Sequence, residues 1–368
     1  MPDMNAQRSA ALWSWFVALC SSHALGTPPG APNGTPNGTM QVVSGDASFR
    51  RYFRAYTEHG SWVLVDAPPQ REDSATFVAV QQRLRGSGTR VPAVLAADLE
   101  QGFMCLEDFG SELLLTRLQA QPEAAGLWYH RAFEQLLRIQ ASASSGKQCQ
   151  SDLPAYDEAM LRREMQLFRD WLCGELLNLQ LSTAEQALWE AVQTELVAAA
   201  LAQPSVVVHR DYHARNLMVL EGDGQEPALG VIDFQDAVFG PCSYDLVSLL
   251  EDCYIAWPRE QVRQWLLEWW AMAGTGMEQE AFLQAADLMG VQRHLKAAGI
   301  FCRLCLRDGK PGYLQDLPRT LAYITRLDSR GALREFADFL QARVLPGVQA
   351  RLLQLQQEGV LPGEGSGA

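Results

Sequence analysis

Lysine is almost missing from this chain. Only three of the 368 residues are lysine, Lys147, Lys296 and Lys310, so arginine supplies nearly all of the positive charge. Acidic residues outnumber basic ones, and the formal net charge is −13. Proteins that bind nucleic acids need a basic surface to displace counterions from the phosphates. The charge balance therefore predicts no nucleic-acid partner.

The chain also lacks a long apolar segment and a regular cysteine framework. No apolar run reaches the length of about 20 residues that spans a bilayer, which predicts no membrane partner. Eight cysteines are scattered over the chain without paired spacing. This usage predicts reduced thiols and a cytoplasmic protein.

The most informative segment is residues 205–233. Four β-prone residues lead into His-Arg-Asp at 209–211, and Asn216 follows five positions after the aspartate. A short apolar strand, a turn at 222–224 and a second apolar strand then lead to Asp233. This order resembles the catalytic segment of protein kinases and of the small-molecule kinases related to them.

The chemistry of phosphoryl transfer explains these residue types. Asp211 is predicted to orient the attacking hydroxyl and to accept its proton. Asn216 and Asp233 offer oxygen atoms to Mg²⁺, a hard cation that prefers oxygen ligands and bridges phosphates. The segment therefore predicts a phosphotransferase that uses ATP and Mg²⁺. The alternative is that these residues only form turns.

The residues after Asp233 indicate the kind of acceptor. Asp233 is followed by Phe-Gln-Asp, and only a short stretch separates it from Tyr244, where a helix is predicted to begin. That stretch is too short for a peptide-binding activation segment, which favours a small-molecule acceptor. Asp245 is predicted to cap this helix or to brace the catalytic loop.

The pattern along the chain predicts an α+β, bilobal fold of the protein-kinase type. Strand-like segments and one helix at 74–85 fill the first part, and helical patterns fill most of the rest. The predicted divisions are an N-terminal helix (1–26), a flexible linker (27–39), a small β-rich lobe that binds nucleotide (40–107), a larger helical lobe that holds the catalytic loop and the substrate (108–358) and a disordered tail (359–368).

The small lobe lacks the lysine that kinases place on their third strand. Arginine is predicted to replace it, because guanidinium suits phosphate well. The predicted nucleotide contacts are the turn residues Ser44, Gly45, Asp46 and Ser48, the cations Arg50 and Arg51 after that turn, and Glu107 at the end of a strand. Alternatively, the protein is a pseudokinase that binds nucleotide without turnover.

Several segments together resemble the aminoglycoside phosphotransferase and choline kinase superfamily, and most closely the bacterial anomeric N-acetylmuramate/N-acetylglucosamine kinases of peptidoglycan recycling. The segments are SGDASFRRYFR (44–54), VDAPP (65–69), LRREMQLF (161–168), VVHRDYHARNLM (207–218), GVIDFQDAVFGPCSYDLVSLL (230–250), DLMGVQRHLKAAGIF (287–301) and RDGKPGYLQDLPR (307–319). The resemblance implies ATP-dependent phosphorylation of an amino sugar at its anomeric hydroxyl.

A basic region in this acidic chain fits an acidic sugar. Residues 290–330 hold eight Lys or Arg against three Asp or Glu. Within it, Arg303, Arg307, Asp308 and Lys310 are predicted to bind the sugar, together with His213 of the catalytic loop. A solvated helix face is the alternative for this cluster. Choline, homoserine and aminoglycosides remain alternative acceptors, and a monomer is predicted.

Overall fold

The computed structural model describes residues 4–23, 25–26, 40–45, 49–142, 153–220, 226–327 and 330–361. The chain forms two compact units, which are Met1–Leu114 with Asn216–Gln235 and Leu115–Arg215 with Asp236–Ala368. The predicted linker (27–39), the turn at 222–224 and most of the predicted tail (359–368) lie outside the described residues.

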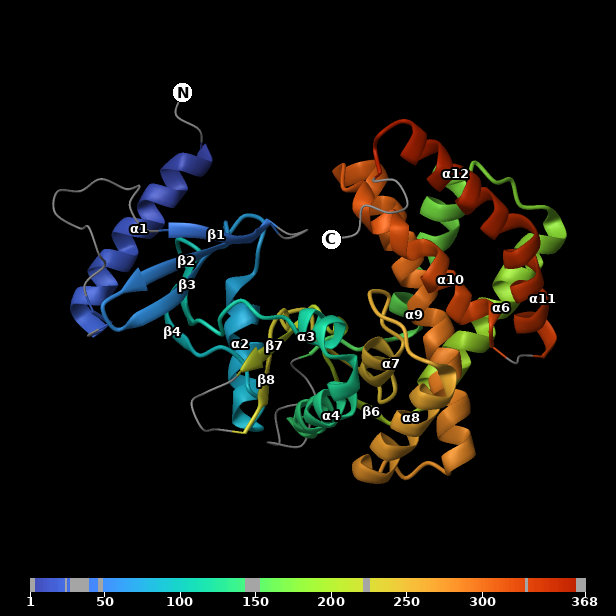
Figure 1. The fold of residues 1–368 in the computed structure, drawn as a ribbon, viewed down its shortest axis with the longest axis horizontal. Coiled ribbons are helices and arrows are strands. Elements are labelled where there is room, and N and C mark those ends of the chain that lie inside the picture. The colour runs from blue at the N-terminus through green and yellow to red at the C-terminus, as the bar shows by residue number, and fades with distance from the viewer. Residues whose placement is uncertain are drawn as a thin grey trace. The chain divides into compact units, whose positions relative to one another are not determined.

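A five-stranded antiparallel sheet forms the centre of the first unit (Figure 1). Its order is β1-β2-β3-β5-β4, with β1 Met40–Gly45, β2 Arg51–Thr57, β3 Gly60–Asp66, β4 Val94–Asp98 and β5 Phe103–Glu107. Helix α2 (Ser74–Gly86) connects β3 to β4 and matches the predicted helix, whereas β4 was not predicted.

Helix α1 (Met4–His23) packs against one face of this sheet. Leu12, Phe16, Leu19 and Cys20 of α1 form one apolar cluster with alternate residues of the strands, such as Phe53. The helix that the sequence predicts at the N-terminus therefore packs against the sheet. Leu12 and Phe16 lie on its buried side, whereas Trp13 and Val17 are only partly buried.

A hairpin from the middle of the chain completes the first unit. Strands β7 (Leu217–Leu220) and β8 (Ala228–Val231) pair antiparallel, as predicted. The backbone N–H of Val219 donates to the carbonyl of Glu112, and that of Val231 donates to the carbonyl of Arg90. Residues 216–235 therefore belong with the small lobe, which differs from the sequence division at residue 108.

The second unit is helical apart from the pair β6–β9. Its elements are α3 Leu114–Ala120, η1 Pro122–Ala124, α4 Ala125–Ala141, α5 Glu158–Leu167, η3 Phe168–Leu176, α6 Thr183–Leu201, β6 Ser205–Val208, β9 Val238–Pro241, α7 Tyr244–Leu250, α8 Arg259–Ala273, α9 Gln279–Asp308, η4 Pro311–Asp316, α10 Leu317–Thr325, α11 Gly331–Phe339, η5 Leu340–Val344 and α12 Leu345–Gln357. Strand β9 and helix α3 were not predicted.

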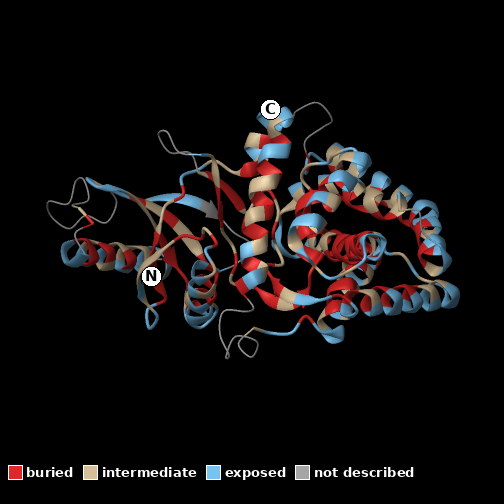
Figure 2. Ribbon diagram, turned by 90° about the horizontal axis from the view of Figure 1, so that it is seen from below, coloured by how far each residue is buried: buried red, intermediate tan, exposed pale blue. Residues whose placement is uncertain are grey.

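Helix α9 runs through the core of the second unit, and more than half of its residues are buried (Figure 2). It packs against η3, a π-helical segment that follows α5 directly. Gly299 permits this close approach, because a Cβ atom there would lie 2.3 Å from the carbonyl carbon of Leu167. The approach places the residues of α9 beside the loop that follows β6.

None of the helices in the described part of the chain is long and apolar enough to cross a membrane. Seven of the eight cysteines are described, and all seven are free thiols. Cys302 is fully buried and Cys305 partly buried on α9, so both contribute to helix packing.

Candidate active site

Two buried carboxylates hold the loop that follows β6. Asp245 accepts the backbone N–H of His209 at 2.6 Å and that of Arg210 at 3.0 Å. Asp252 accepts the backbone N–H of Ala214 at 3.0 Å. Both carboxylates are fully buried. Asp245 therefore braces the loop, which is one of the two roles considered for it, while α7 has no side-chain cap.

Asp211 belongs to this braced loop. The preceding residue, Arg210, has φ of 76°, a left-handed conformation that residues with a bulky side chain rarely adopt. Burial alone would raise the pKa of Asp211, but Lys296 and neighbouring cations hold this pKa below its ordinary value. The carboxylate is therefore ionised at neutral pH and suited to accept a hydrogen bond from a hydroxyl.

Glu164 of α5 pairs with two cations near the loop. Its carboxylate lies 2.5 Å from Nη2 of Arg210 and 3.3 Å from Nζ of Lys296, and it accepts the hydroxyl of Tyr156. Nζ of Lys296 also donates to the hydroxyl of Tyr244 at 2.9 Å. Burial would raise the pKa of Glu164, but Lys296 and Arg210 hold it below the ordinary value.

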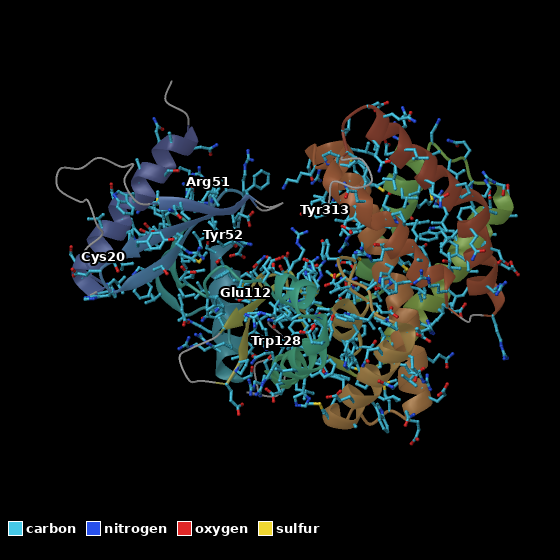
Figure 3. All side chains as sticks on the ribbon, in the orientation of Figure 1. Cys20, Arg51, Tyr52, Glu112, Trp128 and Tyr313 are labelled. Atoms are coloured by element: carbon cyan, nitrogen blue, oxygen red, sulfur yellow. The ribbon has the colours of Figure 1, made fainter. Side chains whose placement is uncertain are left out.

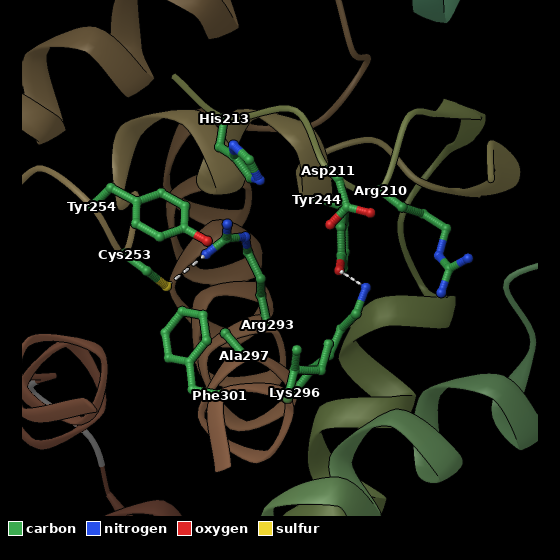
Figure 4. A pocket seen from close by; sticks show the side chains of 11 residues that line it. Arg210, Asp211, His213, Tyr244, Cys253, Tyr254, Arg293, Lys296, Ala297 and Phe301 are labelled. Carbon is green, nitrogen blue, oxygen red and sulfur yellow. Dashed lines mark hydrogen bonds between the residues drawn. The ribbon is translucent and has the colours of Figure 1, made fainter. Parts of the chain in front are cut away.

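A cavity opens at this loop (Figure 4). Its lining comes from the loop, from α7 with the residues after it, and from α9: Arg210, Asp211, His213, Tyr244, Cys253, Tyr254, Arg293, Lys296, Ala297, Ile300 and Phe301. The α9 members recur at helical spacing, so they share one face of that helix. Among the predicted site residues, Asp211 and His213 line the cavity.

The sequence analysis missed the contribution of α9. A signal for it was present, since Arg293 and Lys296 stand three residues apart on one helix, and Lys296 is one of only three lysines. Charged side chains on a buried helix face are costly unless they are paired or functional. That argument would have added both residues to the predicted site.

His213 presents an uncharged ring to the cavity. Burial lowers its pKa below the ordinary value, so the ring is neutral at pH 7. Its edge contacts Tyr254, with ring centroids 5.4 Å apart. The Nδ1 atom is buried and has no hydrogen-bond partner among the residues that the structure describes. The ring is suited to a sugar hydroxyl, and its predicted role in sugar binding stays a prediction.

The predicted metal ligands lie together in the first unit. The side-chain amide of Asn216 donates to a carboxylate oxygen of Asp233 at 3.2 Å, and that of Gln235 donates to the other oxygen at 2.8 Å. Asp233 has φ of 64°, a second left-handed residue that is not glycine. One carboxylate beside an amide oxygen suits Mg²⁺, which usually takes one or two protein carboxylates and completes its shell with phosphates and water.

Arg50, just before β2, and Arg51, its first residue, turn their side chains to different partners. Arg50 is buried and pairs with Glu72 at 3.1 Å, and its guanidinium lies 5.8 Å from the ring centre of Phe77 on α2. Arg51 (labelled in Figure 3) forms an ion pair with Asp66 on the face that α1 covers. Both arginines are therefore already paired with carboxylates.

Asp66 lies at the end of β3, the strand that carries a lysine in kinases. Its carboxylate is fully buried and binds two guanidinium groups, those of Arg51 and of Arg8 from α1 at 2.5 Å. Glu107, the predicted nucleotide contact on β5, uses its side chain to bind Arg90 at 2.7 Å. These pairs fix the ends of the central strands.

The predicted phosphate-binding turn is only partly described. Ser44 and Gly45 end β1 and pair with Tyr52 and Arg51 of β2. Asp46 and Ser48 lie outside the described residues. The role of this turn stays a prediction.

The predicted sugar-binding cluster at the end of α9 is separate from the cavity lining. Arg303 is half-buried, and its Nε atom has no hydrogen-bond partner among the described residues. Arg307 is exposed and pairs with its neighbour Asp308 at 2.7 Å. Lys310 follows Gly309, which ends the helix with φ of 66°. None of these side chains lines the cavity described above, and their role in sugar binding stays a prediction.

Comparison with known sequences identifies the family. The phosphotransferase enzyme family matches residues 39–283, which is most of the chain. The chain belongs to this family. This phosphotransferase is 45% identical over 296 residues to a protein of Pseudomonas putida named N-acetylmuramate/N-acetylglucosamine kinase, covering 79% of this chain and 84% of the relative. A protein of the same name from Neisseria meningitidis is 40% identical over 305 residues, covering 80% and 86%.

Solved structures support the fold of this phosphotransferase. A putative aminoglycoside phosphotransferase from Ralstonia eutropha matches with a TM-score of 0.56 at 13% identity, covering 88% of this chain and 98% of that chain. Ethanolamine kinase from Plasmodium vivax matches with a TM-score of 0.54 at 9% identity, covering 77% and 81%. The predicted aminoglycoside phosphotransferase fold, with a β-rich small lobe and a mostly helical remainder, is confirmed.

Proposed function

We propose that this phosphotransferase transfers the γ-phosphoryl group of ATP to the anomeric hydroxyl of N-acetylmuramate or N-acetylglucosamine. The observation that carries the proposal is the identity of 40–45% with kinases of that name over about four-fifths of the chain. The product would be the sugar 1-phosphate, in keeping with a role in cell-wall recycling.

Asp211 takes the role of the group that orients the acceptor. Its ionised carboxylate accepts the hydrogen bond of the anomeric hydroxyl and receives the proton as the oxygen attacks phosphorus. The braced backbone of the loop supports this role, because phosphoryl transfer depends mainly on positioning and on electrostatic stabilisation.

Asn216 and Asp233 would hold Mg²⁺ on the phosphates of ATP. When bound, the cation would neutralise part of the negative charge of the phosphates. The protein supplies the two oxygen ligands and orients the carboxylate through the amides of Asn216 and Gln235.

The charge of the cavity favours an acidic or neutral sugar over a cationic acceptor. Arg210, Arg293 and Lys296 line it together with one ionised carboxylate, Asp211. Choline and aminoglycosides are cations, which such a lining would repel. This distribution supports the sugar acceptor over those alternatives.

The test is an ATP-consumption assay over N-acetylmuramate, N-acetylglucosamine, glucosamine, choline, homoserine and kanamycin. The expected result is turnover of one or both N-acetylated sugars, with phosphorus at C1 in the NMR spectrum of the product. Turnover of choline, homoserine or kanamycin alone would replace the proposed acceptor. Nucleotide binding without turnover of any of the six would favour the pseudokinase alternative.

The role of Mg²⁺ has its own test. Asp233→Ala should abolish the dependence of ATP affinity on Mg²⁺, because the carboxylate ligand is lost. Calorimetric titrations of ATP with Mg²⁺ and with EDTA measure this dependence. An unchanged Mg²⁺ dependence in the variant would show that Asp233 is not the ligand.

We also propose that the protein works as a cytoplasmic monomer. ATP and free thiols are typical of that compartment, and the seven described cysteines are unpaired. Light scattering after size-exclusion chromatography would test the monomer, since a mass well above 40.8 kDa would contradict it.

A further inference from the structure

Arg293 on α9 is a buried cation that lines the cavity. Only 6% of the residue is exposed. Nε donates to the hydroxyl of Ser248 at 2.6 Å, and Nη1 lies 3.5 Å from Sγ of Cys253. Among the residues that the structure describes, no carboxylate comes within the 4.0 Å of an ion pair with Arg293.

The other two cations of the cavity are paired differently. Arg210 and Lys296 share the carboxylate of Glu164 at 2.5 and 3.3 Å. Asp252, the buried carboxylate that acts on Arg293 from a greater distance, uses its two oxygens for the backbone N–H groups of Ala214 and Tyr254. Arg293 thus keeps a positive charge without a carboxylate in direct contact among the described residues.

Burial of a guanidinium group in this position destabilises the protein unless an anionic ligand pairs with it. Removing an ion from water costs several kcal/mol, which only close pairing or hydrogen bonding repays. One hydroxyl and one thiol are weak partners for five N–H donors. A carboxylate from a ligand would supply the missing partner, and guanidinium binds carboxylate with two parallel hydrogen bonds.

The position of Arg293 relative to Asp211 suits a single sugar. In Figure 4 its guanidinium lies on the side of the cavity with Cys253 and Tyr254, whereas the carboxylate of Asp211 lies on the side with Tyr244 and Lys296. A sugar with one end at Asp211 therefore has another part near Arg293. Tyr254 and Phe301 on that side offer aromatic surface to a pyranose ring.

We propose that Arg293 binds the lactyl carboxylate of N-acetylmuramate while Asp211 receives the anomeric hydroxyl. N-acetylglucosamine has the same ring and the same anomeric hydroxyl but lacks the lactyl group. Arg293 therefore determines how strongly the enzyme prefers the acidic sugar over the neutral one. This inference rests on the proposed function and assigns the residue that recognises the carboxylate of the sugar.

The first experiment changes the enzyme and compares the two sugars. Arg293→Gln should lower kcat/KM for N-acetylmuramate by about tenfold to a hundredfold, the scale of a lost charge-assisted hydrogen bond, and should change kcat/KM for N-acetylglucosamine by less than about threefold. Retained turnover of the neutral sugar shows that the variant is folded. Arg293→Lys should restore part of the loss.

Arg319→Gln is the matched control. Its guanidinium donates to the backbone carbonyl of Cys253 at 2.8 Å but does not line the cavity. The ratio of the two kcat/KM values should therefore stay as in the wild type. An equal loss for both sugars in Arg293→Gln, or a selective loss in Arg303→Gln instead, would overturn the assignment to Arg293.

The second experiment changes the substrate, and its main comparison uses only the wild type. The wild type should use the neutral methyl ester of N-acetylmuramate with a kcat/KM lower by the same factor as the arginine substitution. In Arg293→Gln the difference between acid and ester should disappear. Equal use of acid and ester by the wild type would overturn the inference alone. Failure to phosphorylate either sugar would overturn the proposed function, and the inference with it.

Discussion

The cations around the sheet of the first unit and those that line the cavity of the second unit are paired in different ways. In the first unit, five arginines on and beside the sheet pair with carboxylates, in the pairs Arg8–Asp66, Arg51–Asp66, Arg50–Glu72, Arg54–Asp108 and Arg90–Glu107. In the second unit, two cations share Glu164, and Arg293 has no paired carboxylate among the described residues. Matched pairs fix the strands of the sheet, whereas the unmatched charge leaves a place for an anionic ligand.

The largest expected effect is on catalysis in the second unit. Asp211→Asn should cut kcat by about 10²–10⁴, the scale of a positioned base, because the amide cannot receive the proton. Nucleotide affinity should stay close to that of the wild type. Steady-state kinetics and calorimetry with a non-hydrolysable ATP analogue measure the two quantities, and normal turnover would refute the role of Asp211.

The next largest effect is expected on stability, because Glu164 balances the charges of Arg210 and Lys296. Glu164→Gln leaves the partly buried Arg210 and the buried Lys296 without their negative partner, so the free energy of unfolding should fall by about 3–5 kcal/mol. Urea unfolding measures this change. Glu158→Gln on the same helix removes an exposed pair with Arg162 and should have little effect. Similar stabilities for the two variants would show that Glu164 does not compensate Arg210 and Lys296.

A smaller effect is expected for nucleotide binding in the first unit. Arg50→Ala should raise the Kd of an ATP analogue about tenfold to a hundredfold, if Arg50 contacts phosphate in place of the missing lysine. Arg51→Ala should have less effect, because Arg51 lies on the face that α1 covers. Arg54→Ala, which breaks the pair with Asp108, completes the series. Wild-type affinity in all three would show that these arginines serve only the sheet.

The smallest effect near neutral pH comes from His294, which follows Arg293 on α9. Burial, together with the charge of Arg293, lowers the pKa of His294 to about 3. The unfolded chain takes up the proton near the ordinary value of about 6.5, whereas the folded protein stays neutral. Stability is therefore complete above that pH and falls by about 1.4 kcal/mol per pH unit as the pH drops toward 3.

Thermal or urea unfolding of the wild type and His294→Gln between pH 7 and 4.5 measures this contribution. The difference in stability between the two proteins should shrink steadily below about pH 6.5. A difference that stays constant over this range would mean that the folded protein protonates His294 as readily as the unfolded chain does.

The fold class and the braced loop were predictable from local sequence. The segment from β6 to Asp233 carries short-range spacing and two strands, and these fix the order of its parts whatever packs around them. Strand β4 was missed, because its register comes from pairing with β5 rather than from its own composition. The π-helical segment η3 was missed for a similar reason, since it forms where the chain packs against α9.

Only one side of the cavity could be predicted from the sequence. Its loop side comes from the motif, but its other wall comes from α9, which lies about 80 residues later in the sequence. Tertiary packing alone brings Lys296 beside Tyr244 and Glu164. The predicted basic cluster at Arg303 and Arg307 lies about two to four turns further along α9 than Arg293 and Lys296, and its role in sugar binding stays a prediction.

The hairpin β7–β8 has a consequence for the order in which the newly made protein can fold. Gly230 packs directly on Phe109, where a Cβ atom would lie 2.4 Å from the ring. The first 114 residues therefore leave the ribosome without part of the core of their unit. That core can be completed only after residues 115–235 have been synthesised. A chain that stops at Arg215 would lack the hairpin β7–β8. The surface of the small lobe that this hairpin covers would then be exposed to water and to other incompletely folded chains.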